Sequence, residues 1–307
     1  MSELRSGFIS IVGHPNVGKS TLMNRLVGMK LAAVSKKPQT TRQVIRGILT
    51  EKRGQLVFLD TPGIHAPRDL MGRLMVRQAS KTFSEADLVY VMVEPRLSRG
   101  TEQGRSEESV DRLMTEVDLQ VKGRKDKPPV FCVVNKIDTV PKTALLPVLD
   151  QFQKRFSFSE LIPISALQGD QVDILLAKTF EHLREHEPYF PSDMTSDQPE
   201  KFLAGELIRE KIFRFTGEEI PYASAVDVEE FKEEGQLVRI HAVIFTERDS
   251  QKAILIGAQG QKMKQLGTAA RMDLEKWLGK KVFLKLWVKT LKNWKKDERQ
   301  LKRLGFQ

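Results

Sequence analysis

One segment constrains the fold of this chain more than any other: residues 13–20 read G-H-P-N-V-G-K-S between an apolar run and a helical pattern. The apolar run is Phe8–Val12, and this strand-loop-helix order is the context in which G-x-x-x-x-G-K-[ST] wraps backbone N–H groups around phosphate. A glycine-rich turn that binds nothing is the alternative, but the full motif in this context is uncommon by chance. The predicted phosphate-binding residues are Gly13, His14, Pro15, Asn16, Val17, Gly18, Lys19, Ser20 and Thr21.

A second motif, D-T-P-G, ends another apolar run at residues 56–59 and comprises Asp60, Thr61, Pro62 and Gly63. A carboxylate at the tip of a strand can hold Mg²⁺, together with the Ser20 hydroxyl, while the Gly63 N–H meets a γ-phosphate. Taken alone, D-T-P-G is ordinary turn chemistry, because proline fixes φ and glycine permits positive φ. Its position after a strand favours the magnesium interpretation.

The segment N-K-I-D predicts which nucleotide base is bound. It follows the apolar run at residues 130–134 and supplies Asn135, Lys136 and Asp138. A carboxylate accepts hydrogen bonds from both N1–H and the exocyclic amine of guanine, whereas adenine lacks this pair of donors. The expected ligand is therefore GTP or GDP and not ATP. A weaker signal, S-A-L after residues 161–164, places the Ser165-Ala166 backbone near the guanine oxygen.

A hydroxyl between the phosphate loop and Asp60 is expected to complete the Mg²⁺ shell when the γ-phosphate is present and to leave after hydrolysis. Thr40 and Thr41 both qualify, and Thr41 is preferred without physical grounds that separate the two; a plain solvated loop is the alternative. The third predicted metal ligand is thus Thr41, beside Ser20 and Asp60.

The apolar runs alternate with helical patterns, which predicts an α/β fold with a mostly parallel sheet covered on both faces. Every nucleotide motif follows one of these strands, at the edge where open α/β sheets bind ligands. The polar segment Leu97–Lys127 is expected to be an extended loop with part of a helix. A chain of 307 residues suits two domains.

Positive charge is concentrated at the C-terminal end. Residues 251–307 hold 15 of the 50 Lys and Arg but only 4 of the 40 Asp and Glu, which leaves 35 against 36 for the rest of the chain. This segment contains G-A-Q-G between two helical patterns, and paired glycines let a sugar-phosphate backbone approach closely. A helix-linking turn is the alternative, but the basic surroundings favour single-stranded RNA. The predicted RNA-binding residues are Gly257, Ala258, Gln259, Gly260, Lys262, Lys264 and Arg271.

Together, these motifs resemble the Era-type bacterial GTPases, in which a Ras-like P-loop GTPase domain precedes a smaller α+β K-homology (KH) domain of type II. The resemblance implies a GTPase domain at residues 1–185, a linker at 186–201, a KH domain at 202–290 and a basic C-terminal helix or tail at 291–307. One departure is the uncharged pair Ala258-Gln259, where many such loops carry a basic residue.

The resemblance also bears on catalysis. Ras-like proteins place a water-orienting glutamine just after D-x-x-G, but this chain has Ile64 there, which cannot hydrogen-bond. The expected catalytic residues are Lys19, Asn16 and Thr41, with slow intrinsic turnover. The family suggests that a monovalent cation, K⁺, sits near Asn16 and acts where other GTPases use an arginine.

The implied partner is the 3′ end of small-subunit ribosomal RNA in the 30S-type subunit, with a role in its maturation; no DNA partner is expected. A membrane-surface GTPase whose basic C-terminus contacts anionic lipid is the rival. A tRNA-modification GTPase is disfavoured, because no folate-type domain precedes the motifs and the only cysteine is Cys132 in an apolar strand. We expect a cytoplasmic protein, either free or peripheral at the inner face of the cell membrane.

Two tryptophans interleave with the C-terminal lysines and are candidates for stacking on bases. Trp287 lies in an alternating strand, which favours a core position over base contact. The stretch Trp294–Leu304 is expected to form a basic amphipathic helix, either solvated or in contact with RNA or membrane. The five histidines show no metal-ligand spacing.

Overall fold

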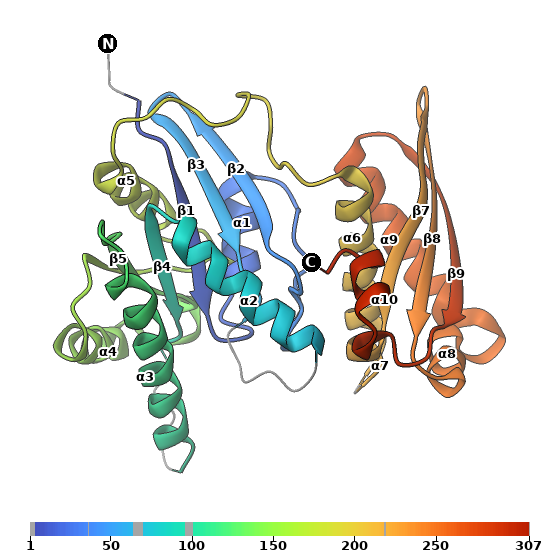
Figure 1. Cartoon of the computed structure of the whole chain (residues 1–307), viewed down its shortest axis with the longest axis horizontal. Helices are drawn as coiled ribbons and strands as arrows, with labels where there is room; N and C mark the ends of the chain where they lie inside the picture. The colour runs from blue at the N-terminus through green and yellow to red at the C-terminus, as the bar shows by residue number, and fades with distance from the viewer. Residues whose placement is uncertain (1–3, 36, 64–69, 96–100, 218, 307) are drawn as a thin grey trace. The chain divides into compact units, whose positions relative to one another are not determined.

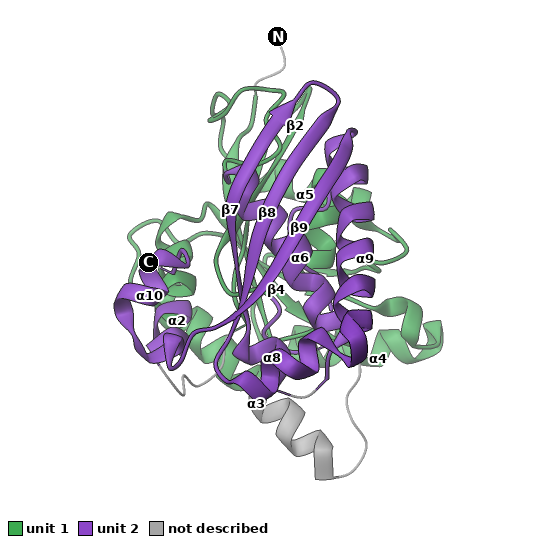
Figure 2. Ribbon diagram, turned by 90° about the vertical axis from the view of Figure 1, so that its right-hand side faces the viewer, with its two compact units in different colours: residues 1–28, 41–65, 76–197 green, residues 29–40, 66–75, 198–307 purple. Residues whose placement is uncertain are grey.

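The computed structural model describes residues 4–35, 37–63, 70–95, 101–217 and 219–306. The chain divides into two compact units (Figure 2): residues 1–28, 41–65 and 76–197 form the first, and residues 29–40, 66–75 and 198–307 the second. Ile64, which stands where Ras-like proteins place a glutamine, lies outside the described residues.

The first unit is built on a six-stranded sheet of order β2-β3-β1-β4-β5-β6, in which only β2 runs antiparallel to its neighbour (Figure 1). This confirms the predicted, mostly parallel sheet. Its strands are β1 (Gly7–Gly13), β2 (Ile45–Glu51), β3 (Gly54–Asp60), β4 (Leu88–Val93), β5 (Val130–Val134) and β6 (Glu160–Pro163). The accompanying helices are α1 (Lys19–Val27), α2 (Leu70–Glu85), α3 (Thr101–Lys122), α4 (Lys142–Arg155) and α5 (Val172–His182); of α2, residues 76–85 belong to this unit and residues 70–75 to the second.

Helices cover both faces of this sheet, which explains why its strands read as nearly continuous apolar runs. On one face, buried residues of α2, α3 and α4 pack against β4 and β5. On the other, the Tyr90 hydroxyl on β4 hydrogen-bonds Thr179 on α5, and the Phe131 ring contacts His182 edge-on. Cys132 lies on β5 with no solvent exposure, and burial raises the pKa of its thiol, as befits a core residue.

Helix α3 corrects one expectation, because residues 101–122 form 22 residues of helix where an extended loop with only part of a helix was predicted. Its later half carries Leu113, Met114, Val117 and Val121, which are buried against the sheet. Their spacing is that of an amphipathic helix. The charged residues earlier in the segment masked this signal.

The segment before the second unit follows the antiparallel edge of the sheet. The Gln55 side-chain oxygen accepts hydrogen bonds from the Tyr189 and Phe190 N–H groups, both at 2.9 Å. The Ile48 N–H donates to the Thr195 carbonyl at 2.8 Å. Residues up to Asp197, which include most of the predicted linker, therefore pack within the first unit.

The second unit has a three-stranded sheet of order β7-β8-β9, in which β7 and β8 are antiparallel and β8 and β9 are parallel. Its elements follow the order helix-strand-strand-helix-helix-strand, with one extra turn of helix, α7, before β7. The elements are α6 (Glu200–Phe215), α7 (Ile220–Ala223), β7 (Ala225–Glu234), β8 (Leu237–Thr246), α8 (Asp249–Ile256), α9 (Gln261–Leu278), β9 (Lys281–Thr290) and α10 (Glu298–Arg303).

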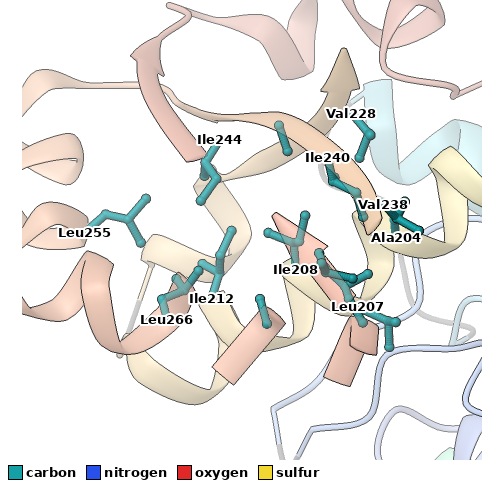
Figure 3. Packing of buried hydrophobic residues seen from close by; sticks show 14 of the residues in the cluster. Ala204, Leu207, Ile208, Ile212, Val228, Val238, Ile240, Ile244, Leu255 and Leu266 are labelled. Carbon is teal, nitrogen blue, oxygen red and sulfur yellow. The ribbon is translucent and has the colours of Figure 1, made fainter. Parts of the chain in front are cut away.

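Aliphatic side chains from α6, α8 and α9 pack against one face of this sheet (Figure 3). Ile208 and Ile212, about one turn apart on α6, belong to this core together with Ile240 and Ile244, which lie on the same face of β8. The core is thus formed by the i, i+4 face of a helix and the alternate residues of a strand.

The C-terminal segment differs from the predicted amphipathic helix. A short 3-10 turn, Trp294–Lys296, precedes the six-residue helix α10, and Trp294, Leu301 and Phe306 are buried against Val243 and Phe245. The Trp294 indole N–H donates to the Ala223 carbonyl at 3.2 Å. Trp294 is therefore a core residue and is not available to stack on bases.

Candidate nucleotide and RNA sites

The phosphate loop joins β1 to α1, and its backbone conformation depends on glycine. Gly18 adopts φ 102° at the N-cap of α1, and a Cβ there would lie 2.3 Å from Asn135 Nδ2. Only glycine fits both the positive φ and this close approach. His14, Pro15, Val17 and Thr21 belong to this loop and the first turn of α1, and Asn16, exposed at the loop tip, has φ 67°.

Lys19 is buried beneath the loop, where its Nζ donates to the Gly13 and His14 carbonyls, both at 3.0 Å. Burial lowers the pKa of this ammonium to about 8, and the Asp60 charge offsets part of that effect. A desolvated cation is stabilised by an anion placed beside it. The loop therefore offers backbone donors and an under-compensated positive charge to the same phosphate groups.

Three oxygen ligands converge next to this lysine. Ser20 Oγ lies 2.6 Å from Asp60 Oδ2 and 2.8 Å from Thr41 Oγ1, and Thr41 Oγ1 lies 3.3 Å from Asp60 Oδ2. Two hydroxyls and one carboxylate form a hard donor set that suits Mg²⁺ completed by water and phosphate oxygens. Among the described residues, no group of three or more His, Cys, Asp or Glu is arranged to hold a metal ion.

The same geometry distinguishes the two candidate threonines. Thr40 Oγ1 lies 2.8 Å from both Ser35 Oγ and the Lys37 carbonyl, within its own loop. Thr41 instead points to Ser20 and Asp60. This arrangement favours Thr41, which the sequence preferred without a physical reason.

The D-T-P-G segment is tied to the strand beside it. Thr61 Oγ1 donates to the Ile11 carbonyl of β1 at 2.8 Å. A Cβ on Gly63 would lie 3.0 Å from the backbone nitrogen of Pro15, so this turn lies against the phosphate loop. Asp60, Thr61, Pro62 and Gly63 are therefore brought to the loop as predicted.

The base-binding motifs are connected by hydrogen bonds. The Ser165 hydroxyl donates to Asp138 Oδ1 at 2.6 Å, which fixes the carboxylate and leaves its other oxygen for a ligand. Asn135 donates to the Val17 carbonyl at 2.7 Å and accepts from the Ala166 N–H at 2.8 Å. Asn135 thus holds the phosphate loop and the S-A-L loop in register. Lys136, at φ 68°, forms an ion pair with Glu94.

One contributor was missed by the sequence reasoning. Arg25, in the last turn of α1, donates from Nε to the Ala166 carbonyl at 2.6 Å and contacts the Leu167 carbonyl. It positions the loop that carries Ser165 and Ala166. A single arginine at a helix end gives no distinctive signal in the sequence.

In the second unit, G-A-Q-G links α8 to α9 as predicted. Gly257 and Gly260 both have φ 74°, and Gln259 has φ 49°. A groove of about 660 Å³ opens between α9 and β9. Of the predicted RNA-binding residues, Gly260, Lys264 and Arg271 line this groove, whereas Gly257, Ala258, Gln259 and Lys262 do not; Lys252, Thr268 and Trp287 line it and were not predicted to bind RNA there.

A phosphate loop, an oxygen ligand set and a guanine-specific carboxylate on a mostly parallel sheet, joined to a G-x-x-G unit, define a P-loop GTPase with a KH domain. The family described as "50S ribosome-binding GTPase" matches residues 8–136, and the KH domain family matches residues 219–295.

Full-length relatives narrow this class. GTPase Era of Staphylococcus haemolyticus is 46% identical over 307 residues, covering 100% of this chain and 98% of the relative. GTPase Era of Geobacter metallireducens is also 46% identical, with 99% of each covered. The chain belongs to the GTPase Era family and is a GTPase.

Two solved structures of Era proteins support this family assignment. A variant of Aquifex aeolicus Era bound to GDP·AlF₄⁻ has a TM-score of 0.86 at 36% identity, with 99% of both chains covered. Era in complex with MgGDPNP and nucleotides 1506–1542 of 16S ribosomal RNA has a TM-score of 0.88 at 37% identity, again with 99% of both covered. Bound GDP, a GTP analogue and Mg²⁺ in these structures accord with the predicted ligands. K⁺ binding stays a prediction.

Proposed function

We propose that this GTPase binds the 3′ end of small-subunit ribosomal RNA and assists maturation of the small subunit, with the bound nucleotide controlling RNA binding. The observation that carries the proposal is the presence, in one chain, of the Asp138-Ser165 base site and of a G-x-x-G groove lined by Lys264 and Arg271. The solved relative with both a GTP analogue and 16S RNA bound supports it.

In the nucleotide site, the Gly13–Ser20 backbone and Lys19 would hold the phosphates, and Asp138 would accept from the guanine edge, with the Ala166 N–H near the guanine oxygen. Ser20, Thr41 and Asp60 would hold Mg²⁺, which neutralises charge that develops on the phosphates. Thr41 follows residues 29–40, which belong to the second unit, and release of its hydroxyl after hydrolysis is the proposed switching event.

For hydrolysis, Lys19, Asn16 and Thr41 are the proposed catalytic residues. Lys19 supplies positive charge and Thr41 orients the metal, while Asn16 is proposed to hold K⁺ near the phosphates. Without a glutamine after D-x-x-G, we expect slow intrinsic turnover.

The proposed domain limits are 1–185 for the GTPase domain and 202–290 for the KH domain, joined by residues 186–201 and followed by 291–307. We also propose a cytoplasmic location. No helix among the described residues is long and apolar enough to cross a membrane.

The lipid-binding alternative has less support, because the apolar residues of the C-terminal segment are already buried. Trp294, Leu301 and Phe306 pack on the sheet, and Lys295 pairs with Glu247 at 3.0 Å. An amphipathic surface helix would have to present its apolar side chains to lipid.

The clamp is best tested at Gly260, which lines the groove and has open space where a Cβ would be added. Gly257 is less suitable, since its Cβ would lie 2.8 Å from Lys262 Cβ. Gly260→Asp places a carboxylate against the RNA backbone, and we expect it to abolish binding of a fluorescent RNA with the 3′-terminal small-subunit sequence. Gly235→Asp, at a β7-β8 turn with φ 62° and equally open space, is the matched control. Equal RNA affinities for the two variants would refute the clamp.

A further inference from the structure

Strand β9 presents alternating lysine and aromatic side chains on the sheet face that is turned away from the helices. Its inward residues, Val282, Leu284, Leu286 and Val288, contact the helix-covered core. The outward residues form what we call the β9 stripe: Lys281, Phe283, Lys285, Trp287 and Lys289. Phe283 is 46% exposed and Trp287 is 52% exposed, so the expected core position of Trp287 is wrong.

Cations lie against both rings. Lys285 Nζ is 4.9 Å from the Trp287 ring centroid, and Arg239 Cζ, from the neighbouring strand β8, is 5.6 Å from that of Phe283. His241 meets Phe283 edge-on with centroids 6.3 Å apart. Aromatic rings with adjacent cations suit flat bases joined by phosphates.

The C-terminal segment covers only one end of this sheet face. Val243 and Phe245 of β8 are buried under Trp294 and Leu301. Arg239 pairs in register with Phe283, farther along β8, and this end stays exposed. The Phe283 end of the stripe is therefore uncovered, whereas Trp287 and Lys289 pair in register with the covered residues Val243 and Phe245 but are themselves exposed on the edge strand.

Charge across the same face favours a narrow anionic chain. The β9 stripe contains three lysines and no acid, whereas β7, two strands away, carries Asp227, Glu230 and Glu234. Lys289 pairs with Glu229 of β7 at 3.7 Å. A flat anionic membrane would meet all of these carboxylates, whereas a single strand of RNA following β9 would pass close only to Glu229, at the Lys289 end.

The stripe also adjoins the RNA groove. β9 is an edge strand, and Trp287 of the stripe also borders the G-x-x-G groove. A G-x-x-G clamp holds about four nucleotides. An RNA longer than the clamp has a short path around the β9 edge from the groove to the stripe.

We propose that the β9 stripe is a second RNA-binding surface, which stacks unpaired bases next to those clamped at Gly260 and contacts their phosphates through Lys281, Lys285 and Lys289. The inference rests on the proposed RNA-binding function and extends it to a longer single-stranded segment.

The test compares fluorescein-labelled single-stranded RNAs of four and twelve nucleotides that share the 3′-terminal small-subunit sequence, with the full chain. Phe283→Ala and Lys285→Ala should each weaken twelve-nucleotide binding about five- to tenfold, since stacking contributes on this scale. Both variants should leave four-nucleotide affinity unchanged. Phe283→Leu, which keeps an apolar side chain, should weaken long-RNA binding in the same way if stacking, and not packing, is responsible.

Lys232→Ala is the matched control for Lys285→Ala, because Lys232 is an exposed lysine on β7 that pairs with Glu234 at 3.1 Å. Unchanged twelve-nucleotide affinity in Phe283→Ala and Lys285→Ala would overturn the stripe. An equal loss of affinity for both RNA lengths would also overturn it, as would a loss of affinity for phosphatidylserine vesicles alone. Gly260→Asp distinguishes a failure of the proposed clamp from a failure of the β9 stripe. If this variant still binds the four-nucleotide RNA, the proposed clamp is wrong.

Discussion

At the scale of single residues, Asp138 is the residue proposed to determine which purine the site accepts. Ser165 holds one of its oxygens at 2.6 Å, so the carboxylate cannot rotate freely to suit another base. Asp138→Asn replaces an acceptor by a donor, which opposes the guanine amine but matches the C2 carbonyl of xanthine. We expect GTP affinity to fall by about 10⁴-fold and XTP to bind instead. Titration calorimetry with GTP, XTP and ATP measures this directly.

Ser165→Ala serves as the control for that substitution. It removes the supporting hydroxyl and leaves the carboxylate, so it should weaken GTP binding by about tenfold without admitting XTP. Retention of GTP preference in Asp138→Asn would contradict the assignment of this residue.

Asn16 is the residue on which the proposed potassium dependence rests. It is exposed at the tip of the phosphate loop and has φ 67°. We expect phosphate release to be faster in K⁺ than in Na⁺ at equal ionic strength, and Asn16→Ala to abolish the difference while GTP still binds. Equal rates in the two salts, or a K⁺ effect that survives in Asn16→Ala, would show that another group replaces the missing glutamine.

At the scale of elements, the segment before Thr41 is held on α6 and α9 by a four-membered ion cluster within the second unit. Lys30 Nζ lies 2.6 Å from Glu210 Oε1 and 2.7 Å from Asp273 Oδ2. Lys211 contacts the same two carboxylates, with 2.8 Å to Glu210. Two cations therefore neutralise two anions in a mostly buried cluster.

The two lysines allow a matched comparison, because Lys211 is 2% exposed and Lys30 is 36% exposed. Lys211→Met leaves buried carboxylates under-compensated and should cost about 3–5 kcal/mol of unfolding free energy. Lys30→Met should cost about 1 kcal/mol, since solvent screens the exposed partner. All three tryptophans lie in residues 198–307, so their fluorescence in urea reports the second unit. Equal losses of unfolding free energy in the two variants would mean that burial does not determine how much each lysine stabilises the cluster.

The same cluster makes stability depend on pH in a defined direction. Burial alone would raise the pKa of Asp273, but hydrogen bonds from Lys211 and Lys30 outweigh it and lower the pKa. Its stabilising effect is present above the unfolded pKa of about 3.9 and lost as pH falls through the lower folded value. The difference in urea midpoint between the native chain and Asp273→Asn should therefore shrink below about pH 4. A constant difference down to pH 2 would contradict this linkage.

How much could be predicted also depends on the element. The strands that end in nucleotide motifs, and α9, were predicted closely, because apolar runs and helical spacing are local signals. Strand β9 shows the limit. Both its faces carry apolar residues, Leu284 and Leu286 on one and Phe283 and Trp287 on the other, so alternation alone could not say which face the helices cover. The same holds for Thr40 and Thr41, which differ only in what the fold places beside them.

At the scale of the whole molecule, the two sites must influence one another equally if the nucleotide controls RNA binding. Thermodynamic linkage requires that the factor by which GTP changes RNA affinity equals the factor by which RNA changes GTP affinity. We expect this factor to lie between about 5 and 150, the usual range for coupled sites. It is measured with a non-hydrolysable GTP analogue, by RNA anisotropy in one direction and nucleotide calorimetry in the other.

Comparing Lys30→Met with Lys211→Met tests which segment couples the nucleotide and RNA sites. Lys30 belongs to residues 29–40, which lead directly to Thr41. If that segment links the sites, Lys30→Met should bring both factors toward one while each ligand still binds alone. If both factors keep their native values in Lys30→Met, the two sites are coupled by another route. If both factors equal one in the native protein, neither ligand affects the affinity for the other, and the protein consists of two independent binding modules.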